Sequence, residues 1–139
     1  MIVGGLLPAL IFGLGGFFQK TCAQSGISIG PYLVCAGMGA TLAGLAFWLF
    51  LPGRTISLTS GACAMLIGVF WILAMGLVSM ALTRYSTPLS RLAPLYNMNT
   101  LLVVLLSLWL YSEWKNVQVL PLLIGALLIV IGGALVANS

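Results

Sequence analysis

Five long uncharged stretches, separated by short polar turns, constrain what this chain of 139 residues can fold into. Each is mostly apolar and close to the roughly 20 residues that a helix needs to cross the hydrocarbon core of a bilayer. The stretches cover Ile2 to Phe18, Ile29 to Leu51, Gly61 to Thr83, Leu92 to Tyr111, and Val119 to Ala137. The sequence therefore predicts an all-α membrane protein with five transmembrane helices in a single domain over residues 1–139.

The shortage of charge favours a membrane protein over a soluble one. Only 4% of the residues are charged, whereas soluble domains carry about 25%. In a bilayer each helix satisfies its own backbone and presents apolar side chains to lipid. A cleaved signal peptide is the alternative for the first stretch, but no basic segment precedes it. We expect a retained helix and a multi-pass protein of the cell inner membrane, with the lipid bilayer as its surroundings.

Titratable chemistry is almost absent. The chain has one acidic residue, Glu113, five lysines and arginines, and no histidine. Its three cysteines have no short paired spacing that would indicate a disulfide framework or a metal site. No serine has a plausible general base nearby, so we expect no catalytic residue and no enzyme. We also expect no metal, no cofactor and no nucleic-acid partner, because no basic patch is interleaved with aromatics.

Small residues recur along the predicted helices at spacings that place them on one face. Lipid-embedded helices use such stripes to approach each other closely. The glycines assigned to helix packing are Gly5, Gly13 and Gly16 in the first helix, Gly68 in the third, and Gly125 and Gly132 in the fifth.

Polar side chains concentrate on the fourth predicted helix. Ser90, just before the helix, shares one face with Asn97, Thr100 and Ser107, and Tyr96 and Asn99 lie to either side of that face. An unpaired amide or hydroxyl in hydrocarbon costs roughly 2–7 kcal/mol, so this face should look into the bundle or a wet cavity. Two interpretations stay open, a surface that lines a substrate site and hydrogen bonds between helices that fix packing. Trp71 and Phe17 are aromatic candidates for the same lining, although either could face lipid.

Two prolines flank Arg91 at the start of this helix. Pro94 has no N–H to donate, so backbone carbonyls near residue 90 are freed, and the helix start can bend or pivot. Arg91 could anchor the helix end at the interface, or it could reach inward to meet an anionic group.

Glu113 lies just beyond the fourth helix, close to Lys115. A carboxylate does not complement the dipole at a helix C-terminus, so we expect Glu113 to have a partner and to act as a structural pin, as does Pro94. A proton-coupling acid is the alternative, but at a wet interface a carboxylate has little reason to leave its usual pKa.

The run ALTRYSTPLSRLAPLYNMNTLLVVLLSLWLYSEW, followed by LLIGALLIVIGGALV, resembles the second half of an EamA domain. That domain is the repeat unit of the drug/metabolite transporter superfamily, and the shared features fall on Ala81, Leu82, Pro94, Glu113, Gly125 and Gly132. Lys20 matches a lysine common at the end of the first helix. The resemblance implies a single-repeat, five-helix member that transports small metabolites or amphiphilic compounds by alternating access. No acid lies in the first helix, so the proton coupling of four-helix relatives is not implied.

Five spans place the two termini on opposite sides of the membrane, so an inverted pair of repeats requires two chains. Two bases, Arg54 and Lys115, lie in loops on the same side of the membrane as the N-terminus, and the other side carries Lys20, Arg84 and Arg91. A difference of one base barely selects an orientation. We expect an antiparallel homodimer of ten helices, inserted in both orientations, although a homologous partner would also satisfy the geometry. The expected function is transport of a small-molecule substrate through a central cavity. The alternative is a non-transporting membrane subunit that assembles or stabilises a larger complex.

Overall fold

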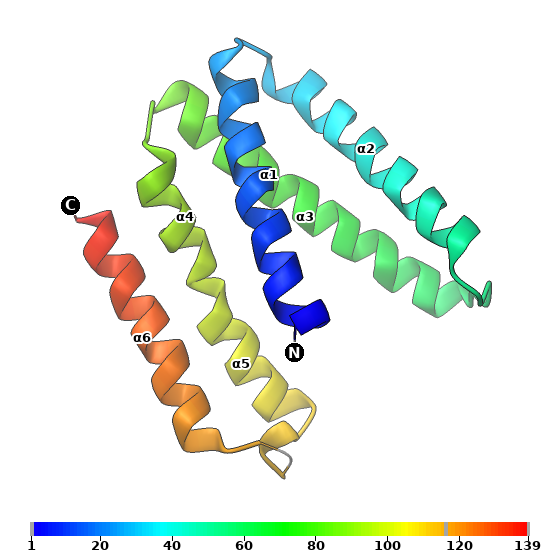
Figure 1. Cartoon of the computed structure of the whole chain (residues 1–139), viewed down its shortest axis with the longest axis vertical. Helices are drawn as coiled ribbons and strands as arrows, with labels where there is room; N and C mark the ends of the chain where they lie inside the picture. Colours follow the sequence, from blue (N-terminus) through cyan, green and yellow to red (C-terminus); the bar gives the residue numbers. More distant parts are fainter. Residues whose placement is uncertain (1, 116, 139) are drawn as a thin grey trace. The chain divides into compact units, whose positions relative to one another are not determined.

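The computed structural model describes residues 2–115 and 117–138 and divides the chain into two compact units, Met1–Ser86 and Thr87–Ser139 (Figure 1). Among the described residues, five helical segments are long and apolar enough to span a membrane. The predicted fold class of five transmembrane helices is confirmed to that extent.

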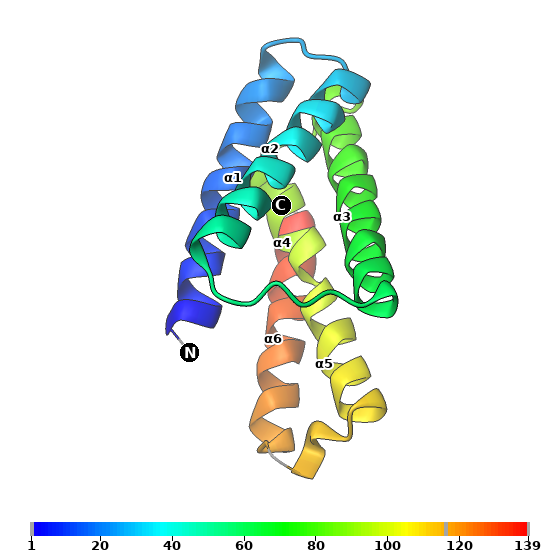
Figure 2. The same ribbon diagram turned by 90° about the vertical axis from the view of Figure 1, so that its right-hand side faces the viewer.

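The first unit contains three long helices. A π-helical turn, Ile2–Leu6, leads into α1 (Leu7–Gln24), which is followed by α2 (Ile29–Phe50) and α3 (Leu58–Arg84). Pro8 has no N–H and its ring clashes with the carbonyl four residues back, which favours the wider turn before α1. Helix α3 packs against both α1 and α2 (Figures 1 and 2).

Local signals explain where the helices of the first unit end. Helix α1 continues to Gln24 and stops before Gly26, whose φ of +79° suits glycine but few other residues. Helix α3 begins at a capping box in which the Ser57 hydroxyl accepts from the backbone N–H of Ser60 at 3.1 Å. The long α2–α3 connection also contains a left-handed glycine, Gly53, with φ +102°.

The second unit is a hairpin. Helices α4 (Leu89–Asn97) and α5 (Asn99–Leu110) together form one candidate span, and a 3₁₀ turn, Glu113–Lys115, connects it to α6 (Val119–Ala137). Helix α6 packs against both α4 and α5 (Figure 2). The buried residues of α6 are Ala126 and Gly133, which lie one heptad apart on the same face.

The predicted helix boundaries need correction at four of the five spans. The first span reaches Gln24 rather than Phe18, the second ends at Phe50, and the third covers Leu58–Arg84. The fourth covers Leu89–Leu110 and is interrupted at Met98 rather than pivoting only at its start. The last span, Val119–Ala137, has the predicted bounds. Residues 19–24 are predicted in a turn, but no glycine or proline lies between Phe18 and Gly26, and α1 continues through them.

Candidate functional site

The fourth candidate span, Leu89–Leu110, is interrupted at Met98. The backbone N–H of Met98 donates to the Leu95 carbonyl at 3.1 Å, and that of Leu101 donates to the Met98 carbonyl at 3.2 Å. Both bonds span three residues instead of the four of an α-helix, so the helix tightens here into a 3₁₀-like turn. Mid-helix turns of this kind often mark a functional hinge or a sequence under strain.

Two amide side chains flank this turn. Asn97 ends α4, Asn99 begins α5, and both are exposed. The Thr100 hydroxyl donates to the backbone carbonyl of Asn97 at 2.8 Å, so it satisfies an acceptor that the tightened helix would leave open. Tyr96 is 37% exposed beside them. The turn therefore carries two amides that are available for contacts outside their own hairpin.

The other predicted site residues are not all brought to this turn. Ser90 and Arg91 lie in the first turn of α4 and are exposed, whereas Ser107 is half-buried on α5. The predicted polar face is thus divided, because Ser90 and Asn97 are exposed while Thr100 and Ser107 are partly covered. Each of these residues remains a predicted, untested contact.

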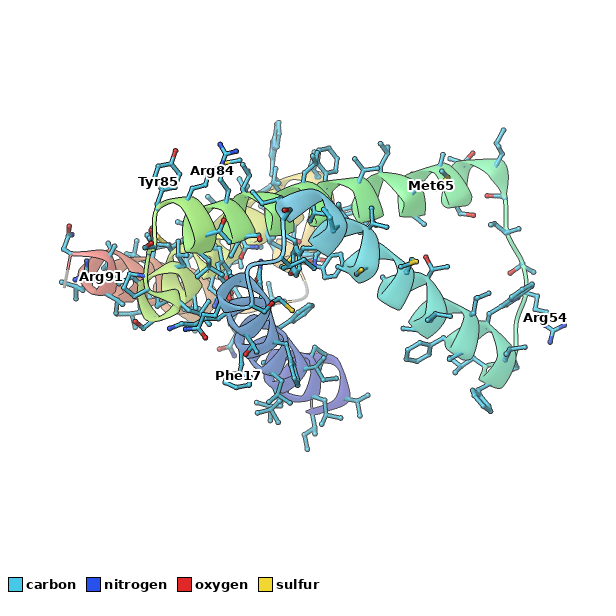
Figure 3. The ribbon with its side chains drawn as sticks, turned by 90° about the horizontal axis from the view of Figure 1, so that it is seen from above. Phe17, Arg54, Met65, Arg84, Tyr85 and Arg91 are labelled. Carbon is cyan, nitrogen blue, oxygen red and sulfur yellow. The ribbon has the colours of Figure 1, made fainter. Side chains whose placement is uncertain are left out.

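The two aromatic candidates belong to the first unit. Trp71 lies on α3 and is 39% exposed. Phe17 lies on α1, is 61% exposed, and packs edge-to-face on Phe18 with ring centroids 5.7 Å apart (Figure 3). Both rings are open enough to meet lipid, a ligand or another chain.

Helix α6 supports the Met98 turn through one glycine. A Cβ added at Gly133 would lie 3.0 Å from the Pro94 carbonyl oxygen and 3.0 Å from the Met98 Cγ. Gly133 is buried, so no larger side chain fits without moving α4 away from α6. In a regular α-helix the Pro94 carbonyl would accept the N–H of Met98, four residues later. Here that N–H donates to the Leu95 carbonyl, and the Pro94 carbonyl faces Gly133.

The glycines predicted to pack helices behave differently. A Cβ at Gly5, Gly13, Gly68, Gly125 or Gly132 would have no heavy atom within 4 Å in the described chain, apart from its own helix backbone and neighbours. Gly16 is half-buried. The role of these glycines in helix packing stays a prediction. Inside the second unit the packing glycine is Gly133, one residue from the predicted Gly132.

The sequence interpretation missed a buried polar contact between α1 and α3. The Gln19 side-chain nitrogen donates to the Met75 backbone carbonyl at 3.2 Å, and only 5% of Gln19 is exposed. Ser79, one turn further along α3, is 3% exposed, and its carbonyl accepts from the Thr83 hydroxyl at 2.8 Å. A glutamine next to Phe17 and Phe18 is a signal that could have been found, because polar groups in apolar helices need partners.

Glu113 lies where the sequence places it, between the fourth and fifth spans. It begins the 3₁₀ turn that ends at Lys115, and both residues are exposed. The preceding Ser112 has φ +53°, a left-handed conformation that reverses the chain after α5. The role of Glu113 as a structural pin stays a prediction.

The chain matches no protein-family model, no curated protein and no solved structure.

Proposed function

We propose that this chain is one half of a membrane transporter, in which two antiparallel copies enclose a central cavity at the Met98 turn. The exposed amides of Asn97 and Asn99 beside that turn are the observation that carries the proposal. Substrate would contact the turn through these two amides and Tyr96, while small metabolites or amphiphilic compounds cross by alternating access.

The depth of the turn supports a transport site. Helix α4 has 9 residues and α5 has 12, so Met98 lies near the middle of the span. With a rise of 1.5 Å per residue, the turn is roughly 13 Å from the start of α4. A hydrocarbon core about 30 Å thick places it close to the midplane, where interrupted helices form the substrate sites of many transporters.

The exposure of the amides supports a second chain. An unpaired amide in hydrocarbon costs roughly 2–7 kcal/mol, so Asn97 and Asn99 would be unstable against lipid. A second copy that brings water and the same amides to the midplane removes that cost. A wet cavity shared by the two copies would account for two amides beside one turn. Hydrogen bonds between helices would be a weaker reason to keep them, because each contributes only about 0.6 kcal/mol on average.

Three sequence features agree with the dimer. The resemblance to a single EamA repeat implies that a partner repeat is needed. The odd number of candidate spans makes that partner antiparallel for an inverted pair. The balance of Arg54 and Lys115 against Lys20, Arg84 and Arg91 allows the chain to insert in either orientation.

The residue types indicate which substrates fit. The fourth span carries amides and hydroxyls but no carboxylate, so it offers no counter-charge for a permanent cation. Neutral, zwitterionic or weakly anionic compounds are therefore the expected substrates. Arg91, at the start of α4, is the basic residue that could attract an anionic group toward the span.

Flux into proteoliposomes tests the proposal. Purified chain is reconstituted, and the uptake of radiolabelled zwitterionic amino acids is compared with that of tetraphenylphosphonium, a permanent cation. We expect chain-dependent equilibration of at least one amino acid, lost in Asn97→Leu and Asn99→Leu and kept in Leu102→Val, an exposed apolar position on α5.

Two results would overturn the proposal. Uptake of the cation that disappears in Glu113→Gln, with protons moving in the opposite direction, would indicate coupling by the acid. The absence of any flux, together with normal stability of both asparagine variants, would favour the non-transporting subunit.

A further inference from the structure

A pocket of about 460 Å³ opens where α2 ends and α3 begins. Its walls come from the last turn of α2, the connection and the first two turns of α3. The lining includes Trp48, Arg54, Thr55, Ile56, Gly61 and Ala64. Figure 3 shows Arg54 on this connection, at the opposite end of α3 from Arg84. The volume is within the range of about 300–1,000 Å³ that small-molecule sites occupy.

The pocket belongs to a membrane–water interface. The connection joins two candidate spans, Ile29–Phe50 and Leu58–Arg84, so it emerges where both helices leave the bilayer. Ala64 lies six residues into α3, which corresponds to a depth of roughly 9 Å along the helix. One end of the pocket is therefore at headgroup level and the other is beside the start of the acyl chains.

A positioned cation lies at the outer end. The Arg54 guanidinium carbon is 5.7 Å from the centroid of the Trp48 ring, a cation–π distance. This contact keeps the guanidinium beside the Trp48 ring, and a guanidinium has five N–H donors with which it can meet an anion. The only acidic residue of the chain, Glu113, is in the other unit, so no carboxylate of the first unit competes for Arg54.

The remaining walls match an amphiphile. Thr55 adds a hydroxyl near Arg54, while Ile56, Gly61 and Ala64 contribute apolar lining. The Ser60 hydroxyl is committed to the capping box, since it accepts from the Ser57 N–H at 3.0 Å. This box fixes the start of α3 and with it the pocket rim. A ligand with an anionic head and an apolar body would satisfy both ends.

We propose that this pocket binds the phosphate headgroup of an anionic phospholipid, with Arg54 on the phosphate, Trp48 beside the glycerol region and Ala64 next to the first methylenes. A bilayer supplies this ligand at high local concentration, and Arg–phosphate pairs are among the strong charge-assisted contacts. The site is separate from the Met98 turn and does not depend on transport.

Native mass spectrometry of the purified full chain tests the site. The chain is released from micelles after titration with phosphatidylglycerol, with phosphatidylcholine, or with glycerol 3-phosphate as a headgroup without acyl chains. We expect one phosphatidylglycerol to be retained in preference to phosphatidylcholine. Arg54→Gln should weaken that binding by about tenfold, the loss expected for one charge-assisted contact.

Two variants separate the pocket from general charge and folding effects. Arg84→Gln removes the same charge at the other end of α3 and should retain the lipid. Ala64→Leu keeps every charge, fills the inner wall and should reduce binding.

Equal losses in Arg54→Gln and Arg84→Gln would overturn the proposal, because net charge alone would then explain binding. Equal retention of the two phospholipids would also overturn it. If glycerol 3-phosphate bound as tightly as phosphatidylglycerol, the acyl chains would contribute nothing to binding. The site would then be one for a free phosphate compound, and the lipid assignment would be overturned.

Discussion

The Cβ of an alanine at position 133 would lie 3.0 Å from the carbonyl oxygen of Pro94, so Gly133 and Pro94 set the distance between α6 and α4. The same Cβ would lie 3.0 Å from the Cγ of Met98, the residue at which the fourth span is interrupted. The close approach of α6 therefore supports the turn that carries the two exposed asparagines.

Replacing Gly133 by alanine should destabilise the hairpin. Overpacking against a backbone carbonyl costs about 1–3 kcal/mol, because the carbonyl cannot rotate away as a side chain can. The unfolding midpoint in sodium dodecyl sulfate, measured at a dilution that keeps the chain monomeric, should fall. Gly132→Ala is the matched control, since its Cβ would meet nothing within 4 Å. A larger loss for Gly132→Ala than for Gly133→Ala would contradict the observed packing.

Gln19→Leu should weaken the association of α1 with α3. The variant removes the hydrogen bond from the Gln19 side chain to the Met75 carbonyl, and such bonds contribute about 0.6 kcal/mol on average and at most about 1.7. Unfolding in the same detergent series measures the loss. Thr21→Val is the control, because the Thr21 hydroxyl bonds to Phe17 within its own helix. Equal effects of the two variants would argue against a specific role for Gln19.

Ser112→Gly should stabilise the turn after α5. Ser112 has φ +53°, which glycine adopts without the penalty of roughly 1 kcal/mol that a Cβ brings. A higher unfolding midpoint is expected for this variant. Ser112→Val should lower the midpoint, since β-branched residues tolerate this conformation least. A fall on replacement by glycine would show that the serine side chain contributes more than the strain costs.

The charge balance predicts insertion in both orientations. A cysteine at position 138, in a chain whose three native cysteines are replaced by alanine, should react with an impermeant maleimide from both faces of the membrane. Removing both bases from the N-terminal side, as in Arg54→Gln with Lys115→Gln, leaves none against three and should shift labelling strongly to one face. One-sided labelling of the parent would exclude dual topology.

Hydropathy was sufficient to predict the spans but not their packing faces. Helices such as Val119–Ala137 are apolar all round, so the sequence period does not show which side meets a neighbour. The choice between Gly132 and Gly133 depends on the approach of α4, which is a tertiary property. The sequence does contain the signals for the longer α1 and α3. No glycine or proline lies between Phe18 and Gly26, and Ser57 and Ser60 form a capping box at the start of α3.

The candidate site was partly predictable for similar reasons. Asn97 and Asn99 stand out because amides are costly in hydrocarbon. The interruption between them was not predicted, since Pro94 indicates a bend near the helix start, whereas the observed turn is four residues later at Met98. The Thr100 hydroxyl donates to the Asn97 carbonyl at this turn, but threonine makes such bonds in regular helices too, so the residue type does not reveal the interruption.

Water access to the Met98 turn tests the central claim most directly. In the chain without native cysteines, Asn97→Cys and Asn99→Cys are exposed in native membranes to a small, charged methanethiosulfonate reagent. Leu128→Cys provides the comparison, because Leu128 is an exposed apolar residue at the middle of α6, away from the buried face of Ala126 and Gly133. A wet cavity between two antiparallel copies predicts fast reaction at positions 97 and 99 and almost none at 128, because thiolates form in water and not in hydrocarbon. Reaction at 97 and 99 as slow as at 128 would contradict the proposed transport site.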